Sequence, residues 1–235
     1  SDAVADGDPI LAVLRGSAIN QDGPSSGLTV PNGPSQQSVV RKALAVDNIS
    51  PEQIDYLEAH GTGTALGDPI EMGALGAVFA DRREPLWVGS AKTNLGHLEG
   101  AAGIAGVMKV ILALQHETIP PHLHFKTPSP RIPWQELNVR IPTVQQPWPR
   151  GDRPRLAGVS SFGFSGINAH VVLEEPPIIA GDAKPHRRCN LLPLSAKHPE
   201  ALRQLATRLA ARIAGDEQPS AVDVSATAQI RRSHE

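Results

Sequence analysis

Three apolar runs of this sequence each end in a turn that is rich in glycine and polar residues. The runs lie at residues 56–59, 86–91 and 156–162, and the turns after them contain His60, Lys92 and Phe164. Helical patterns separate the runs, at residues 68–79 and 99–117. Strands that alternate with helices are typical of α/β domains, whose sheet is covered by helices on its faces. Residues 1–175 are therefore predicted to form one α/β domain.

The sequence changes character near residue 176. Residues 176–190 are rich in proline and charge, which predicts a connector. Beyond it, apolar residues from Leu202 to Ile213 recur every three or four positions between Pro199 and Gly215. Proline in the first turn and glycine just past the last one are typical of helix ends. With a shorter helix after Asp223, residues 191–235 are expected to form part of a small α/β subdomain.

Local signals predict where the helices of the first domain begin. Ser35 is the expected N-cap of a helix over residues 34–46, and residues 50–53 and 68–71 both match a capping box. The second box should start a helix that runs to about Phe79. The helix at residues 99–117 is nearly all apolar and small in its first half, which predicts a helix that is buried all round.

Composition and charge exclude several classes of function. The formal net charge is −2 over 235 residues, which gives no electrostatic case for binding nucleic acid or an anionic membrane. No apolar run is long enough to cross a bilayer, and the acidic first residues do not resemble a signal peptide. The single cysteine, Cys189, cannot form an internal disulfide. That fits a reducing compartment, so a cytoplasmic protein is expected.

His60 lies where a strand should end and a glycine turn begins. Glycines allow unusual backbone angles there and leave space for a ligand. Thr62 and Thr64 add hydroxyl groups that can bind a polar substrate. The stretch therefore suggests a substrate crevice at the carboxyl end of a strand, where α/β sheets usually bind ligands. Taken alone, the His60-Gly61 pair favours a core histidine before a tight turn, since most histidines are structural.

A second turn of the same kind follows residues 86–91. It holds Lys92, Asn94 and His97, with Glu99 just beyond. A lysine in such an apolar neighbourhood must be paired or have a shifted pKa, and Glu99 is the candidate partner. Two imidazoles and an ammonium are suitable donors to an enolate or an oxyanion. The helix that starts near Glu99 would add its amino-terminal dipole.

The third turn, in "SSFGFSGINAH", offers backbone N–H groups near Phe164 and the side-chain amide of Asn168. Other histidines favour ordinary roles. His116, His122 and His124 are interrupted by prolines and lack a cysteine or carboxylate cluster, so no metal site is predicted. His170, within a strand, is expected to be a hydrogen-bonded structural residue.

These motifs together resemble a known family. "EAHGTGTALGDPIE", "SAKTNLGHLEGAAGIAG" and "GVSSFGFSGINAHVVLEE", with "GSAINQDGPSSGLTVPNGPSQQ" upstream, resemble the carboxyl-terminal half of a β-ketoacyl synthase of modular type I polyketide synthases. The resemblance covers residues 1–175. The tail is similar to the start of the linker that leads to the acyltransferase domain.

The resemblance implies a thiolase-like fold, with layers αβαβα made of two similar halves. It implies a transferase that performs a decarboxylative Claisen condensation. An acyl chain is held as a thioester on a cysteine, and a malonyl-type extender on an acyl carrier protein loses carbon dioxide. The resulting enolate then attacks the acyl group. No cofactor is bound directly, because the phosphopantetheine arm of the carrier protein brings the substrates.

The resemblance also assigns roles to the polar turns. His60 and His97 would polarise the extender thioester and stabilise the enolate, with electrostatic support from Lys92. The threonines at positions 62 and 64 would face the phosphopantetheine arm. Phe164 resembles the gatekeeper between the acyl and extender pockets, and its N–H would contribute to an oxyanion hole. The loop departs from the family pattern at positions 165 and 167, where serine and isoleucine replace the usual glycine and threonine.

The family's nucleophilic cysteine has no counterpart in this sequence. It lies in an Ala-Cys-Ser type turn of the amino-terminal half, and no such motif is present. Cys189 lies in the connector and is not a substitute. The chain therefore supplies the His/His/Lys half of the site and is expected to be inactive by itself. Implied partners are the missing amino-terminal half, the acyl carrier protein, the adjacent acyltransferase domain and, in the complete domain, a second copy as a homodimer.

Two alternatives share these residues. A non-condensing ketosynthase-like scaffold would dock the carrier protein and position the next domain, but it would not need His60, Lys92 and His97 together. A thiolase acting on coenzyme A would share the fold, but the Gly-Thr-Gly-Thr turn and the tail disfavour it.

Overall fold

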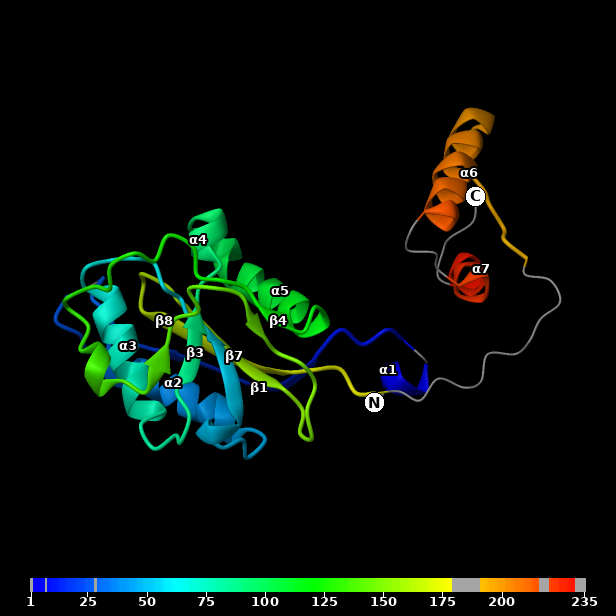
Figure 1. Cartoon of the computed structure of the whole chain (residues 1–235). Helices are drawn as coiled ribbons and strands as arrows, with labels where there is room; N and C mark the ends of the chain where they lie inside the picture. Colours follow the sequence, from blue (N-terminus) through cyan, green and yellow to red (C-terminus); the bar gives the residue numbers. More distant parts are fainter. Residues whose placement is uncertain (1, 7, 28, 179–190, 216–219, 231–235) are drawn as a thin grey trace. The chain divides into compact units, whose positions relative to one another are not determined.

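The structure is a computed structural model of the whole chain and describes residues 2–6, 8–27, 29–178, 191–215 and 220–230 (Figure 1). The chain divides into two compact units, Ser1–Ile178 and Ile179–Glu235. Each unit is described by itself.

A six-stranded mixed sheet forms the centre of the first unit. Its strand order is β1-β8-β7-β2-β3-β5. The bounds are β1 Val13–Gln21, β2 Ile54–Glu58, β3 Leu86–Gly89, β5 Val139–Arg140, β7 Leu156–Phe162 and β8 Ile167–Glu174. Strands β7, β2, β3 and β5 run parallel, whereas β8 and β1 run antiparallel to their neighbours. The carboxyl ends of β2, β3 and β7 therefore meet at one edge of the sheet. A separate two-stranded sheet pairs β4 (Thr118–Ile119) with β6 (Gln146–Pro147).

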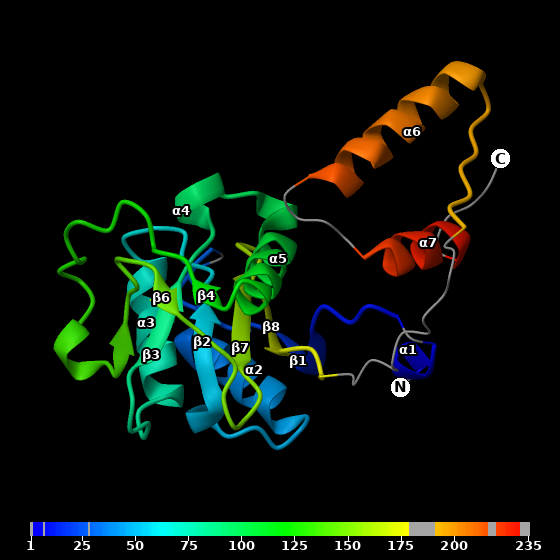
Figure 2. The ribbon, with the colours of Figure 1, turned by 45° about the vertical axis from the view of Figure 1, so that its right-hand side comes forward.

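Helices lie on both faces of this sheet, as the alternating pattern predicts. Helices α2 (Gly33–Ala45) and α3 (Gly67–Val78) lie on one face and α5 (Ala102–Gln115) on the other, as Figures 1 and 2 show. The shorter helical elements are α1 Asp2–Ala5, α4 Lys92–Leu95, η1 Pro51–Gln53, η2 Glu99–Ala101 and η3 Trp134–Glu136.

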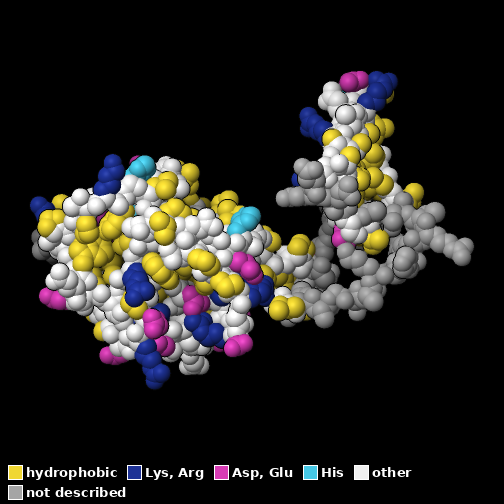
Figure 3. All heavy atoms as spheres, viewed as in Figure 1, with side chains coloured by type: hydrophobic (Ala, Val, Ile, Leu, Met, Phe, Trp, Pro, Cys, Tyr) yellow, Lys and Arg dark blue, Asp and Glu magenta, His cyan; other side chains and the backbone are white. Residues whose placement is uncertain are grey.

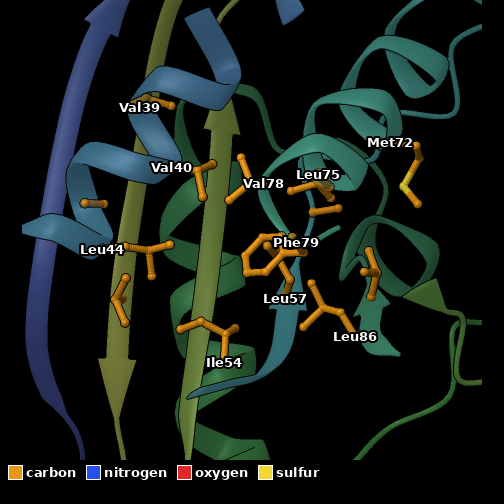
Figure 4. Packing of buried hydrophobic residues seen from close by; sticks show 14 of the residues in the cluster. Val39, Val40, Leu44, Ile54, Leu57, Met72, Leu75, Val78, Phe79 and Leu86 are labelled. Carbon is orange, nitrogen blue, oxygen red and sulfur yellow. The ribbon is translucent and has the colours of Figure 1, made fainter. Parts of the chain in front are cut away.

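Each face of the sheet has its own hydrophobic core. The larger core joins α2 and α3 to β2 and β3, and Figure 4 shows side chains such as Val40, Phe79 and Leu57 pointing toward one another. The second core packs Val110 and Leu114 of α5 against the opposite face of the sheet. The larger core includes Ala59 and Phe162, at the carboxyl ends of β2 and β7, so it extends to the edge at which these strands stop.

Helix α5 is not buried all round, which corrects the sequence prediction. One side of it packs on the sheet, through residues that include Val110. The opposite side carries Ile104, Met108 and Leu112, which are 59%, 58% and 50% exposed. Figure 3 shows hydrophobic side chains at the surface where α4 and α5 lie. The small, apolar composition suits a helix packed on two sides, but the first unit covers only one of them.

The helix starts confirm one capping prediction and correct two. The box at residues 50–53 is present, with the N–H of Ser50 donating to Gln53 Oε1 at 2.8 Å. The N-cap of α2 is Asn32 rather than Ser35, since the Asn32 side chain accepts the Ser35 N–H at 3.1 Å. Residues 68–71 do not form a capping box, because α3 begins at Gly67 and both carboxylates bind the preceding turn.

The described residues of the second unit form two helices and no strand. Helix α6 (Pro199–Ala214) ends at Gly215 as predicted, and α7 (Ala221–Ile230) begins two residues before Asp223. The Ser225 hydroxyl donates to the Leu191 carbonyl and so ties α7 to the segment before α6. Cys189 and residues 179–190 of the expected connector lie outside the described residues. Within the described residues, no helix has both the length and the hydropathy of a membrane span.

Candidate active site

The loops after β2 and β3 bring two histidine rings into contact. His60 follows β2, and His97 follows α4 across Gly96, whose φ is 73°. The centroids of the two rings are 5.4 Å apart and their planes are nearly perpendicular, at 84°. Thirty-six positions separate the two residues in the sequence, so the parallel pairing of β2 and β3 creates this contact.

The half-buried ring of His60 is held neutral. Phe162, at the end of β7, packs against it with ring centroids 5.8 Å apart. Burial lowers the pKa of His60 to about 4, and the charge of Lys92 and the neighbouring ring of His97 lower it further. Its Nδ1 is buried and has no hydrogen-bond partner within the described residues. A neutral imidazole of this kind can donate one N–H to a developing negative charge.

One nitrogen of the exposed His97 ring already has a hydrogen-bond partner. Its Nδ1 accepts the backbone N–H of Glu99 at 3.1 Å. A neutral ring that accepts at Nδ1 carries its proton on Nε2, so Nε2–H is the donor left for a ligand.

Carboxylates from α3 hold the turn that carries His60. Glu71, which is 4% exposed, accepts the N–H of His60 at 2.8 Å and that of Gly61 at 2.9 Å. Asp68 accepts the N–H of Gly63 at 3.0 Å. Gly61 has a φ of 49°, and a Cβ there would lie 2.9 Å from that of Ser90. The two carboxylates that resemble a capping box in sequence therefore stabilise a tertiary turn.

Burial also changes the acidity of these groups. It raises the pKa of Glu71 to about 7, although the two N–H donors oppose the shift. Burial raises the pKa of Asp68 as well, again against its backbone hydrogen bonds. The charge of Lys92 favours the ionised form of Glu71, so the two residues are electrostatically linked.

Lys92 has different partners from those expected. Burial lowers its pKa, and the negative charges of Glu71 and Glu58 oppose this effect. Glu99 is exposed and forms no ion pair with Lys92 among the described residues, which corrects the predicted pairing. Glu99 instead donates its N–H to the ring of His97. The carboxylates that act on Lys92 thus come from β2 and α3.

Thr62 and Thr64 lie in the turn after His60. Their hydroxyl oxygens are 3.4 Å apart, and that of Thr64 also accepts the N–H of Gly67 at 3.0 Å. Thr62 is partly buried and Thr64 is exposed. Asn94, also exposed, accepts the hydroxyl of Thr93 at 3.2 Å.

The third turn only partly matches its prediction. Phe164 is 83% exposed, so it is available to a further surface. Asn168 is 1% exposed, and its amide donates to Asn20 at 3.1 Å and to Asp22 at 2.7 Å. That amide is therefore committed to the link between β8 and β1, which corrects its assignment as a substrate-binding group. Position 168 lies inside a strand pair, where neighbouring side chains satisfy it first.

Glu58 was not singled out by the sequence, yet it lies beside the site. A small pocket next to α4 is lined by Glu58, Lys92 and Ser160, together with apolar residues of α5 and β7. Phe162 and Glu71 are further residues of the site that the motifs did not indicate. A carboxylate within the apolar run "YLEA" was the available signal for Glu58, because a buried charge needs a partner.

Two further histidines, His122 and His170, have packing roles. Nδ1 of His122 accepts the N–H of Ser90 at 3.2 Å, and its ring packs on Phe125. His170 is fully buried and its Nδ1 lies 2.9 Å from the Ser160 hydroxyl, as expected for a hydrogen-bonded structural residue. No cluster of metal-ligating side chains occurs among the described residues.

Two family descriptions match the chain over nearly its whole length. "Beta-ketoacyl synthase, C-terminal domain" matches residues 11–126, and "Ketoacyl-synthetase C-terminal extension" matches residues 128–235. The chain belongs to the β-ketoacyl synthase family. The first match contains all three of His60, Lys92 and His97. The second begins within the long segment between β4 and β5 and runs through the tail of the chain.

Relatives of this β-ketoacyl synthase region are modular polyketide synthases. The chain is 50% identical to polyketide synthase GfsA of Streptomyces halstedii, over 99% of the chain and 3% of that protein. It is 49% identical to erythronolide synthase EryA3 of Saccharopolyspora erythraea, over 99% of the chain and 8% of that protein. The chain thus spans a small fraction of the length of these relatives.

Solved ketosynthases have the same fold. The ketosynthase from module 6 of the bacillaene synthase of Bacillus subtilis matches with a TM-score of 0.87 and 40% identity, over 99% of this chain and 43% of that one. Ketosynthase twelve of the bacillaene synthase of Bacillus amyloliquefaciens matches with a TM-score of 0.88 and 38% identity, over 99% and 41%. The chain therefore has the thiolase-like fold and corresponds to the carboxyl-terminal half of a ketosynthase.

Proposed function

We propose that this chain is the extender-handling half of a ketosynthase that performs decarboxylative Claisen condensation. The substrates are an acyl thioester and a malonyl-type extender on an acyl carrier protein. The observation that carries the proposal is the contact between the rings of His60 and His97, 5.4 Å apart, with Lys92 near enough to shift the pKa of His60. These groups form a concentrated set of donors at the carboxyl end of a parallel sheet.

The proposed step needs a site for a negatively charged oxygen. The bond between the carboxylate carbon and the α-carbon of the extender breaks, carbon dioxide leaves, and the electron pair forms an enolate. The neutral ring of His60 and the Nε2–H of His97 donate to the thioester oxygen as its charge develops. Donors fixed in place before the reaction lower the barrier most effectively. The Lys92 ammonium adds a favourable field without a proton transfer.

The enolate carbon then attacks the carbonyl of the acyl thioester, and the cysteine thiolate leaves. In this proposal a separate amino-terminal half supplies that cysteine, so the isolated chain is inactive. The exposed side of α5 supports the need for a second half, because a stripe of Ile104, Met108 and Leu112 is unusual at a solvent-facing surface. The complete domain would act as a homodimer beside an acyltransferase domain.

No cofactor binds directly in this proposal, because the phosphopantetheine arm is carried by the substrate. Thr62 and Thr64 line the turn beside His60 and would contact that arm through their hydroxyl groups. Phe164 would separate the acyl and extender pockets, which fits a large aromatic ring that the first unit leaves 83% exposed.

The test is extender decarboxylation by the full ketosynthase domain that contains this chain. His60→Ala and His97→Ala should each lower the rate of carbon dioxide release by about a hundredfold or more. His116→Ala, an exposed histidine at the end of α5, is the matched control and should retain the wild-type rate. Unchanged rates in both site variants would reject the roles. Carrier-protein binding without any carbon dioxide release would instead support the scaffold alternative.

A further inference from the structure

A buried polar cluster is centred on Glu58, whose charge acts on Lys92. Glu58, the last residue of β2, is 3% exposed. Its Oε2 accepts the Tyr56 hydroxyl at 2.6 Å and the Lys109 ammonium at 2.8 Å. The hydroxyl of Tyr56 also accepts a hydrogen bond from Lys109 at 2.8 Å. The charge of Glu58 is therefore compensated by a cation on α5, as a buried carboxylate requires.

The other oxygen of Glu58 binds the main chain at the start of α4. Its Oε1 accepts the backbone N–H of Ala91, the N-cap residue of that helix. The carbonyl of Ala91 in turn accepts the N–H groups of Asn94 and Leu95, at 2.9 and 3.1 Å. Because Ala91 precedes Lys92, a shift of this peptide unit would move the lysine.

Two glycines make room for the cluster. A Cβ at position 106 would lie 3.0 Å from Cγ of Glu58, and a Cβ at position 89 would lie 2.6 Å from the Tyr56 hydroxyl. Gly106 is in the middle of α5, where alanine has the higher helix propensity. The absence of a side chain there lets Glu58 reach the base of α4, which is too short to be held by its own hydrogen bonds.

We propose that Glu58 is a positioning residue for Lys92, acting through the backbone N–H of Ala91 and anchored by Lys109 and Tyr56. This inference rests on the proposed function, since it assigns a role within the same site. Glu58 and Lys92 also line the same small pocket. The negative charge of Glu58 partly offsets the effect of burial on the pKa of Lys92. Glu71 has the same effect from α3, and the ring of His60 is the other titratable group that interacts with Lys92.

The competing explanation is that the ion pair of Glu58 with Lys109 only stabilises the fold. The ion pair of Glu175 with Arg155 provides a matched control. Glu175 is 6% exposed, and its Oε2 accepts the Arg155 Nε at 2.7 Å. Its Oε1 accepts the backbone N–H of Arg155 at 3.3 Å. This pair has the same design as Glu58 with Lys109 and Ala91, but it lies at the end of β8 away from the histidines.

The experiment compares Glu58→Ala, Glu58→Gln, Glu175→Ala and Glu175→Gln in the full ketosynthase domain. Glu58→Ala should lower kcat for decarboxylation by about ten- to a hundredfold with little change in KM, because Lys92 loses its position. Glu58→Gln retains an acceptor for Ala91, so its loss in kcat should be smaller. In this variant the alkaline limb of the profile of kcat against pH should move to lower pH, because Lys92 loses a negatively charged neighbour and its pKa falls. The Glu175 variants should lower the unfolding temperature and leave kcat and the pH profile unchanged.

The outcomes separate this inference from the proposed function. Equal kcat losses in the Glu58 and Glu175 variants, or an unmoved alkaline limb in Glu58→Gln, would overturn the positioning role. Glu58→Gln keeps the side-chain volume, so it decides the question even if Glu58→Ala does not fold. If His60→Ala also retains the wild-type rate, the proposed function itself fails. A loss in His60→Ala with none in the Glu58 variants rejects only the role of Glu58.

Discussion

Glu71 binds the backbone on both sides of the His60 peptide, with its two oxygens 2.8 and 2.9 Å from the nitrogens of His60 and Gly61. One buried carboxylate on α3 thereby determines the path of the chain after β2. The position of the His60 ring relative to His97 depends on this pair of hydrogen bonds, because the turn is otherwise rich in glycine.

Replacing Glu71 should therefore affect both stability and chemistry. Glu71→Ala leaves two partly buried N–H groups without an acceptor, and we expect the free energy of unfolding to fall by about 2 kcal/mol. Decarboxylation by the full domain should fall by about tenfold or more as the ring loses its orientation. Denaturant unfolding and carbon dioxide release measure the two effects. Glu52→Ala is the control, since Glu52 accepts the Arg83 N–H at 3.2 Å but is exposed. Equal effects of both variants would contradict this view.

The acidity of Glu71 predicts how stability depends on pH. Its pKa in the folded protein is about 7, raised from 4.5 by burial. A raised pKa means that the folded state favours the protonated form. The resulting stabilisation is fully present below about pH 4.5 and is lost as the pH rises through 7. Glu71→Gln cannot ionise, so the difference in unfolding free energy between this variant and the wild type should change over that interval. A pH-independent difference would rule out the shift.

The pKa of His60 can be tested directly by NMR titration of labelled histidine. We expect His60 to titrate near pH 4, well below the ordinary value of 6.5, because burial disfavours the charged ring. Lys92→Met removes a nearby positive charge and should raise the pKa of His60. It should not restore 6.5, since burial is the larger cause. The resonance is assigned by its loss in His60→Ala. Titration near 6.5 in the wild type would contradict a desolvated ring.

The exposed side of α5 predicts a surface that must be covered. Met108→Glu should leave the far-UV circular dichroism of the isolated chain unchanged and reduce its binding of a hydrophobic dye. In the full domain the same change should lower the unfolding temperature strongly, because a charge would be buried between the halves. Ala77→Glu, at an exposed position of α3 on the other face of the sheet, should have little effect in both tests. A full domain that tolerates both changes equally would show that this surface stays in solvent.

Two helix glycines should respond in opposite directions to alanine. At Gly106 a Cβ would lie 3.0 Å from Glu58 and 3.1 Å from Val159, and Glu58 is fixed by its own hydrogen bonds. Gly106→Ala should therefore destabilise the domain by about 1–3 kcal/mol. At Gly73, in the middle of α3, nothing lies within 4 Å of the Cβ position. Gly73→Ala should stabilise by up to about 1 kcal/mol. Thermal unfolding of both variants checks the contrast. An increase in stability for Gly106→Ala would mean that the Glu58 side chain can move away from the added methyl group.

Much of the fold could be predicted from local patterns. The strands at residues 54–58, 86–89, 156–162 and 167–174 follow from runs of apolar residues that end in turns. The helix Pro199–Ala214 follows from apolar periodicity, with proline at its start and Gly215 just past its end. The contact of His60 with His97 follows from a general property of parallel sheets, whose carboxyl ends lie at one edge. These predictions succeed because each depends on the nearest neighbours in sequence or on a rule of topology.

The errors share a physical cause, which is competition from partners distant in sequence. Residues 68–71 match a capping box, but Glu71 finds stronger donors in the turn after β2. Asn168 has a free amide in sequence, but strand pairing places it against Asn20 and Asp22. Glu99 is near Lys92 in sequence, but the strand and helix that pack there present Glu58 and Glu71 instead. A local sequence motif does not show whether a side chain will bind a nearby partner or one that is distant in sequence.

The turns that carry His60 and Lys92 are held through main-chain N–H groups that donate to the buried carboxylates of Glu71 and Glu58. The side chain of Thr62 makes none of these bonds, so its replacement should leave them intact, whereas the Thr64 hydroxyl also accepts the N–H of Gly67 at the start of α3. Under the proposed function, a change of the side chain at position 62 would alter what the site accepts while the geometry of the histidine pair is retained.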